Sequence, residues 1–278
     1  HTGDVNSRTR QEVTDLLLES GEWTAFRTRP YNKVPVLATT PADIFVTAID
    51  SRPLAADPAL YINEQKEAFE TGLTVLAKLT DGSVFVCKSA DADISSSVPE
   101  AKVESFSGPH PVGLVGTHIH FLSPVSANKT VWHIGYQDVI AIGQLFNTGK
   151  LFSERVVALA GPGVDKPRLV RTLRGASLDE LGAGEYRTGN HRVLSGSVFD
   201  GRTAQGALAY LGRYHNQVSV LAEGTEREFF GFVAPGLKKF SLTGLFMSSL
   251  FGLKNHDFTT STGGSERAMV PLGTYEKM

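Results

Sequence analysis

In the first half of the chain, the spacing of apolar residues alternates between the pattern of a buried strand and the pattern of a helix. The runs Ile44–Asp50 and Val84–Cys87 are short, apolar and rich in β-branched residues, which predicts buried strands. Between them, apolar residues recur at helical spacing from Ile62 to Leu79, after a helix start at Asp57-Pro58. A strand, a helix and a strand in this order form one βαβ unit, so the pattern predicts parallel strands in an α/β sheet.

Four further segments extend this expected α/β domain. Periodicity predicts helices over Asn6–Ser20 and Tyr136–Phe146, each followed by a glycine that ends the helical run. A short strand is expected over Lys102–Phe106. The stretch Phe26–Leu37 contains two prolines, which exclude regular helix and favour an extended backbone.

After Gly149 the period changes to two, which indicates a second, β-rich α+β domain. Its expected elements are a strand and tight turn in RVVALAGPGV, a strand with a short helix capped at Ser177, a strand and turn in HRVLSGSVFDG, and a hairpin over 217–236. Phe240–Gly252 has the pattern of an amphipathic helix. We therefore expect domains at 1–149 and 150–236, followed by a helical and connecting segment at 237–278.

Charge and cysteine content exclude several classes of protein. The 278 residues carry a net charge of −2 without a basic stripe, which argues against a nucleic-acid-binding protein. The single cysteine, Cys87, excludes a disulfide framework, a cysteine-based zinc site and a cluster bound by four cysteines of this chain.

The sequence predicts no transmembrane helix, because no run approaches the roughly 20 apolar residues that a spanning helix needs. The apolar run Phe240–Leu253 is short and is interrupted by two glycines. No signal peptide is expected either. The chain begins at His1 without an initiator methionine, so we expect a piece of a longer protein.

Of two familiar sequence motifs, one is incomplete and the other is absent. In LAGPGVDKP, Gly161 and Gly163 supply the first two glycines of a dinucleotide-binding fingerprint, but Lys166 occupies the third position and Pro167 follows it. We interpret this segment as a turn at the end of a strand. The chain also lacks a G-x-S-x-G elbow, which argues against a serine hydrolase.

The segment Gly113–Asp138 concentrates three histidines with a tryptophan and a tyrosine. If THIHF were a strand, His118 and His120 would point to the same face, as a pair of metal ligands should, and His133 and Asp138 could join them. No known ligand spacing supports a metal site, so histidines that bond to the backbone are the favoured interpretation.

The segment Phe26–Lys33 is the other candidate for ligand binding. It alternates aromatic rings with Arg27, Arg29 and Lys33, which are donors to carbonyl oxygens or anions. From the residues alone, a solvated basic linker is the simpler interpretation.

Four segments together resemble one protein family: GLVGTHIHF, VWHIGYQDVIAIGQLF, LAGPGVDKPRLVRT and AYLGRYHNQVSVL. They are similar, in the same order, to the A subunit of the bacterial Na⁺-translocating NADH:quinone oxidoreductase, and the similarity runs from about Thr9 to Tyr275. The resemblance implies a Rossmann-like α/β domain followed by a β-grasp (soluble-ligand-binding, ubiquitin-like) domain. Complete members also have an N-terminal lipoyl-like domain and a C-terminal helical region.

The resemblance implies a peripheral subunit on the cytoplasmic face of the bacterial inner membrane. The complex would oxidise NADH, reduce ubiquinone and export sodium, with flavins and iron centres in the partner subunits. The glycine-rich loop that cradles flavin and NADH in the related subunit of respiratory complex I does not occur before Gly108. We therefore expect this chain to hold no covalent cofactor, no flavin, no NADH, no metal and no complete active site.

The resemblance also makes quinone a candidate ligand for the two segments. A quinone needs a flat apolar slot and donors at two carbonyl oxygens. We expect Phe26 or Tyr31 to stack on the ring and Arg27, Arg29 or Lys33 to donate, with His118 and His120, beside Tyr136, as a second candidate. The alternatives are a docking subunit whose quinone is bound by a neighbouring membrane subunit, and a stand-alone metallohydrolase.

Overall fold

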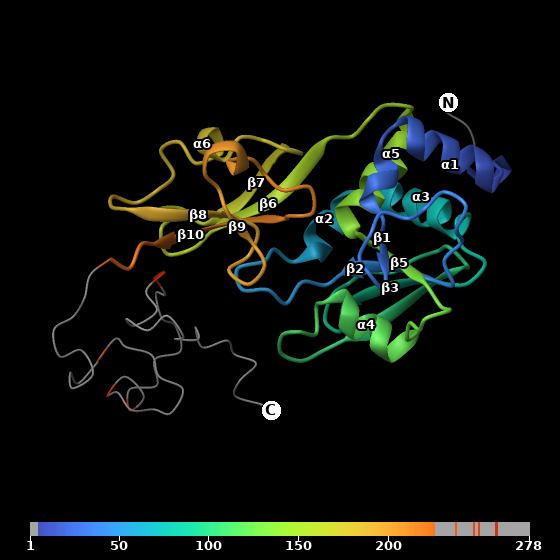
Figure 1. The fold of residues 1–278 in the computed structure, drawn as a ribbon, viewed down its shortest axis with the longest axis horizontal. Coiled ribbons are helices and arrows are strands. Elements are labelled where there is room, and N and C mark those ends of the chain that lie inside the picture. The colour runs from blue at the N-terminus through green and yellow to red at the C-terminus, as the bar shows by residue number, and fades with distance from the viewer. Residues whose placement is uncertain (1–4, 226–236, 238–246, 248–249, 251–258, 261–278) are drawn as a thin grey trace. The chain divides into compact units, whose positions relative to one another are not determined.

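The computed structural model describes residues 5–225, 237, 247, 250 and 259–260 (Figure 1). The chain divides into two compact units. The first comprises residues 1–156 together with 171–174, and the second comprises 157–170 together with 175–278.

The first unit is built on a five-stranded sheet with the order β1-β5-β2-β3-β4. The strands are β1 (Arg27–Arg29), β2 (Ile44–Ala48), β3 (Val84–Ser89), β4 (Ala101–Phe106) and β5 (Val131–Gly135). Strands β2, β3, β4 and β5 run parallel to one another, and β1 runs antiparallel to β5. The predicted parallel βαβ unit is therefore confirmed in β2 and β3.

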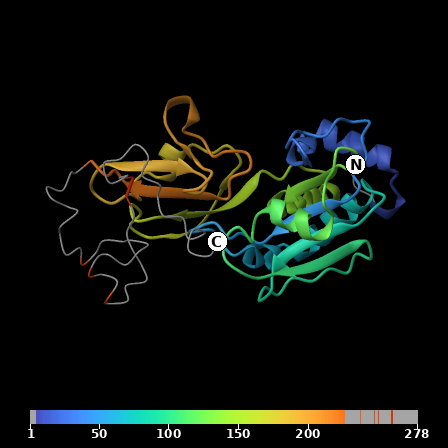
Figure 2. The ribbon, with the colours of Figure 1, turned by 60° about the horizontal axis from the view of Figure 1, so that its bottom comes forward.

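Helices cover both faces of this sheet, because alternate strand residues point to opposite sides. On one face, residues such as Ile44 and Val86 pack against the helices α1 (Arg10–Glu19), α3 (Lys66–Ala77) and α5 (Tyr136–Thr148). On the other face, Phe45 and Phe85 pack against α4 (Val115–Leu122). The first unit thus has three layers (Figure 2), and the expected α/β class is confirmed.

Two predicted helices begin or break differently from the expectation. Helix α1 begins at Arg10 because Thr9 forms a capping box with Glu12, and the preceding residues Val5–Ser7 form a separate 3₁₀ turn (η1). The long helix predicted up to Leu79 is divided into α2 (Pro58–Glu64) and α3, because Gln65 between them leaves the helical conformation. A second 3₁₀ turn, η2, covers Glu22–Ala25.

The segment THIHF lies in helix α4, so the strand considered for it is wrong. The apolar residues Val115 and Ile119 of α4 are four apart, and both are buried against the sheet. A spacing of four places two residues on the same face of a helix, and this packing outweighs the extended propensity of a short segment.

On the face of the sheet opposite α4, close contact between α3 and α5 determines the packing. A Cβ added at Gly143 would lie 1.7 Å from the carbonyl oxygen of Ala68, and one added at Gly72 would lie 2.2 Å from the carbonyl oxygen of Val139. The two helices therefore approach so closely that only glycine fits at these two positions.

The sheet of the second unit has the order β7-β6-β10-β8-β9. Its elements are β6 (Glu154–Ala160), β7 (Arg168–Leu173), α6 (Leu178–Leu181), β8 (His191–Ser195), β9 (Arg202–Thr203), η3 (Gly206–Leu208) and β10 (Gln217–Ala222). Strand β10 is parallel to β6 and antiparallel to β8. The side chain of Ser177 caps α6, as predicted.

The glycines of LAGPGVDKP form a turn, which confirms that interpretation. Gly161 has a φ of 122°, and the amide of Val164 donates to its carbonyl oxygen over 3.1 Å. The second strand of the predicted hairpin lies outside the described residues, and so does the predicted helix Phe240–Gly252, apart from Met247 and Leu250.

Candidate functional site

The pairing of β1 with β5 brings the two candidate segments of the sequence together. Arg27 lies directly opposite His133, and Arg29 lies opposite Val131. Directly opposed residues of paired strands share a face of the sheet, as do residues two apart on one strand. The side chains of Arg27, Arg29 and His133 therefore emerge on one face, and we name this set, together with Tyr31 and Lys33, the β1 corner.

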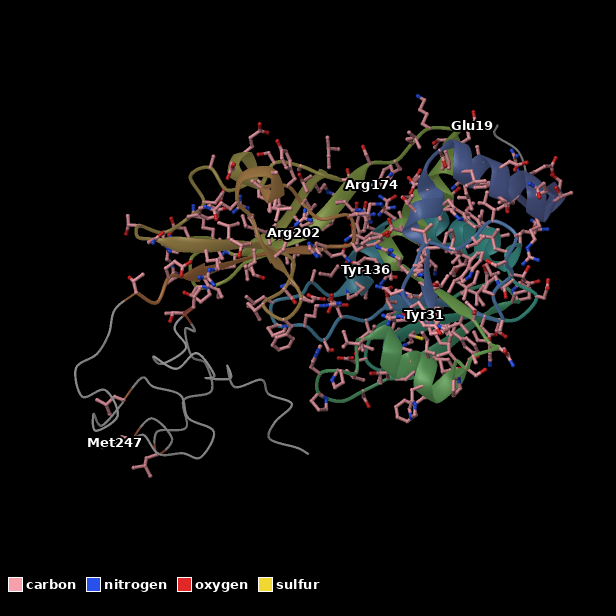
Figure 3. All side chains as sticks on the ribbon, viewed as in Figure 1. Glu19, Tyr31, Tyr136, Arg174, Arg202 and Met247 are labelled. Atoms are coloured by element: carbon pink, nitrogen blue, oxygen red, sulfur yellow. The ribbon has the colours of Figure 1, made fainter. Side chains whose placement is uncertain are left out.

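A tight turn after β1 holds Tyr31 and Lys33 in place. The Arg29-Pro30 peptide bond is cis, and Tyr31 and Asn32 have φ values of 77° and 49°. The amide of Thr28 donates to the carbonyl oxygen of Lys33 over 2.7 Å. The turn leaves the Tyr31 side chain in solvent, with 82% of its surface exposed (Figure 3).

His133 is uncharged at neutral pH. Burial, the largest cause, and the positive charges of Arg29 and Arg27 together lower its pKa to about 3. Its Nε2 atom lies 3.3 Å from Oδ1 of Asn32. Because this amide oxygen can only accept, the neutral ring donates its Nε2 proton there.

Two cations of the β1 corner have no acidic partner. Within the part of the chain that the structure describes, the guanidinium of Arg29 and the ammonium of Lys33 form no ion pair, and the buried Nε of Arg29 has no hydrogen-bond acceptor. The sequence from Trp23 to Ala42 contains no Asp or Glu. The β1 corner can therefore offer hydrogen-bond donors and positive charge to a carbonyl oxygen or an anion.

The structure corrects the role expected for Phe26. This ring is fully buried and packs against Trp23 and Trp132, with ring centroids 5.6 Å and 5.7 Å away. It therefore has no free face on which a ligand could stack. Tyr31 is the exposed ring of the candidate site.

The second candidate set, His118, His120 and Tyr136, does not present its groups together. Residues two apart on a helix point about 200° apart, so His118 and His120 face different directions. His118 is fully buried, its Nε2 donates to the carbonyl oxygen of Val112 over 2.8 Å, and burial lowers its pKa. This confirms the interpretation of His118 as a histidine bonded to the backbone.

Tyr136 is also engaged in the interior. Its hydroxyl oxygen accepts from Nε2 of Gln137 over 3.1 Å, and burial raises the pKa of Tyr136 to about 12. Among the described residues, no group of three or more His, Cys, Asp or Glu side chains could hold a metal ion.

One further polar cluster, for which the sequence contains no local signal, lies at the carboxyl end of β2. There the strand order reverses between β2 and β5, a position where open α/β sheets bind ligands. Ser51 Oγ lies 2.9 Å from Nδ1 of His110 and accepts from the amide of Gly113, also at 2.9 Å. These bonds attach the loop before α4 to the end of β2, so we interpret them as structural.

None of the helices in the described part of the chain is long and apolar enough to cross a bilayer.

Comparison with known proteins gives the family. The family model described as "NqrA second alpha/beta domain" matches residues 8–151, and the model described as "NQRA C-terminal domain" matches residues 156–206. Relatives named as the A subunit of Na(+)-translocating NADH-quinone reductase include those of Saccharophagus degradans and Shewanella denitrificans. They are 58% and 59% identical over 99% of this chain, which spans 62% of the length of each.

A solved structure shares the fold. One chain of an NAD⁺-reducing [NiFe]-hydrogenase in the H₂-reduced state superposes with a TM-score of 0.51, covering 78% of this chain and 50% of the other at 11% identity. The resemblance recognised in the sequence is confirmed by the family models: the chain belongs to the NqrA family.

Proposed function

We propose that the chain is part of the A subunit of a Na⁺-translocating NADH:ubiquinone oxidoreductase. The names of its relatives and their identity of about 58% support this proposal. The subunit would be peripheral, on the cytoplasmic face of the inner membrane, and would assemble with subunits that carry the flavins and iron centres. The strand order of the first unit supports a Rossmann-like domain, and we propose a β-grasp domain for the second.

Within this complex, we assign the β1 corner to quinone binding. The observation that carries this assignment is the placement of Arg29 and Lys33, two cations without an acidic partner among the described residues, beside the exposed ring of Tyr31. A quinone head group has a flat face and two carbonyl oxygens that gain negative charge upon reduction. Tyr31 would contact the flat face, and the cations would donate to an oxygen and stabilise that charge.

His133 would support this site without binding the quinone directly. As an uncharged ring that donates to Asn32, it fixes the turn that presents Tyr31 and Lys33. The set of His118, His120 and Tyr136 has no part in this proposal, because Nε2 of the buried His118 bonds to the carbonyl oxygen of Val112 and the hydroxyl of Tyr136 accepts from Gln137.

Fluorescence can test this assignment directly. Trp23 and Trp132 lie edge to face, with ring centroids 5.4 Å apart, and Trp132 lies opposite Thr28 of β1. A quinone bound at the β1 corner should therefore quench their emission. We expect a titration of the chain with a short-chain ubiquinone to give saturable quenching, and the double variant Arg29→Ala, Tyr31→Ala to bind at least about tenfold more weakly.

A matched control uses the second unit. Arg202→Ala, Tyr210→Ala removes the same two side-chain types from exposed positions and should leave the quenching curve unchanged. Equal affinity of the wild type and the Arg29, Tyr31 variant would refute the β1 corner as the site. Absence of saturable quenching in the wild type would favour the alternative, a docking subunit whose quinone is bound by a neighbouring membrane subunit.

A further inference from the structure

A row of exposed apolar side chains follows β1. Val36 and Leu37 are 69% and 57% exposed, and they come shortly after Tyr31 and the partly exposed Val34. We name these four residues the β1 ridge. Single exposed apolar residues need no explanation, but four within seven consecutive positions concentrate apolar surface on one short segment, and this is costly to leave in water.

Hydrogen bonds at its middle and at its C-terminal end hold the β1 ridge in one conformation. The indole of Trp23 donates to the carbonyl oxygen of Pro35 over 3.0 Å, which anchors the middle of the segment to the core. The amide of Thr39 donates to the carbonyl oxygen of Val36, also over 3.0 Å. Exposure of the ridge is therefore a property of the fold, and little further ordering would be needed when it meets a partner.

Positive charge accompanies this apolar surface. Arg29 and Lys33 lie next to Tyr31 and Val34 in the chain, and neither has an acidic partner among the described residues. The nearest acidic residues along the chain are Glu22 and Asp43, and Glu22 is already paired with Arg174. A partner of the β1 ridge must therefore accept apolar side chains and supply negative charge close to them.

An anionic phospholipid surface meets both requirements. Side chains with more than half of their surface exposed stand out from the protein, and a fluid bilayer can accept such a protrusion without a preformed pocket. Aliphatic residues enter the boundary between head groups and acyl chains, tyrosine favours the same depth, and Lys and Arg extend toward the head groups. Anionic lipids attract such cations over a distance of about 10 Å.

We propose that the β1 ridge docks this chain on the surface of an anionic lipid bilayer, with Val36 and Leu37 inserted among the lipids. Tyr31, Arg29 and Lys33 are shared with the quinone site assigned above, but the inserted residues Val36 and Leu37 are not, so docking can be tested without quinone. It goes beyond that function by giving the chain a direct contact with lipid.

Vesicle binding tests the proposal. The purified chain would be sedimented with vesicles of phosphatidylcholine alone, or with about one third phosphatidylglycerol, in low and high salt. We expect binding to the anionic vesicles, weakened by salt, and at least about tenfold weaker partition for the double variant Val36→Ser, Leu37→Ser. The control Leu60→Ser, Leu151→Ser removes two leucines that are 60% and 61% exposed, and it should bind like the wild type.

Each result decides the proposal. A selective loss in the Val36, Leu37 variant supports docking through the ridge. Failure of the wild type to bind anionic vesicles overturns it, and so does equal binding of the wild type and the Val36, Leu37 variant. Because quinone titration uses different variants, loss of one proposal leaves the other standing.

Discussion

Protonation of His133 links the stability of the first unit to pH. In the folded chain its pKa is lowered to about 3 by burial and then by Arg29 and Arg27, whereas the ordinary value for histidine is 6.5. Between these two values the unfolded chain binds a proton that the folded chain does not. Protonation therefore favours the unfolded state, and the free energy of unfolding falls as the pH falls from about 6.5 toward 3.

The variant His133→Phe should lessen this acid sensitivity. It keeps a ring on β5 but removes the titrating group, so we expect the wild type to lose about 2 kcal/mol more than the variant between pH 7 and pH 5. Urea unfolding at the two pH values measures the difference, and fluorescence reports the first unit because both tryptophans lie in it. Equal losses in the two proteins would show that His133 is charged in the folded state.

At the residue scale, the sequence predicts which side chains are candidates for ligand binding, but not which of them lie close together in the fold. The alternation of basic and aromatic residues singled out Arg29 and Tyr31, yet nothing in that stretch indicated that it pairs with a strand more than 100 residues later. The burial of Phe26 was equally hidden, because an aromatic residue directly before a basic segment suits both a ligand site and a core position beside an edge strand.

At the scale of elements, periodicity identified most helices and strands, and local chemistry decided their limits. The expected strands around Ile44–Asp50 and Val84–Cys87 are present, since β-branched apolar runs suit a buried parallel sheet. The break at Gln65 was not predictable, because apolar residues continue at helical spacing through it. For THIHF, contact with the sheet selected a helix in a segment too short for its period to decide.

The close contact between α3 and α5 predicts that adding a single methyl group there destabilises the first unit. Gly143→Ala would place Cβ against the backbone carbonyl of Ala68, which cannot move without separating the helices. We expect a loss of about 3 kcal/mol or more in the free energy of unfolding. Urea titration followed by tryptophan fluorescence measures it.

Gly116 provides the control for this experiment. It also lies in a helix, α4, but a Cβ there would meet nothing within 4 Å. Since alanine favours helix over glycine, Gly116→Ala should stabilise the first unit by up to about 1 kcal/mol. If both variants behaved alike, the close approach of α3 and α5 would be disproved.

At the scale of the whole molecule, the first unit is not continuous in sequence. Residues Arg171–Arg174 belong to it, although they lie in β7 and the turn after it. Arg174 donates two hydrogen bonds to the carboxylate of Glu22, which is almost completely buried. The contribution of residues 171–174 to the first unit could not be predicted from sequence, because a β-strand pattern does not show which distant carboxylate an arginine will bind.

Removal of this arginine should weaken one unit more than the other. Arg174→Met leaves the buried Glu22 carboxylate without this partner, so we expect the first unit to lose about 3 kcal/mol. Hydrogen exchange should become faster for the amides of β2 and β3 but change little for those of β8 and β10. Arg171→Met is the control, because its partners Glu64 and Glu154 are accessible to solvent and the loss should stay below about 1 kcal/mol. Uniform acceleration in both units would contradict the division.

The small size of β1 has a consequence for self-association. Three residues shield the outer backbone edge of β5, whose neighbour on the other side is the buried apolar strand β2. Short edge elements open more readily than the strands they protect. In mild urea, a chain whose β1 has detached would therefore present β5 as a template for pairing with another copy. Light scattering should rise with protein concentration under these conditions, and a signal that stays flat would mean that β1 holds until the whole first unit unfolds.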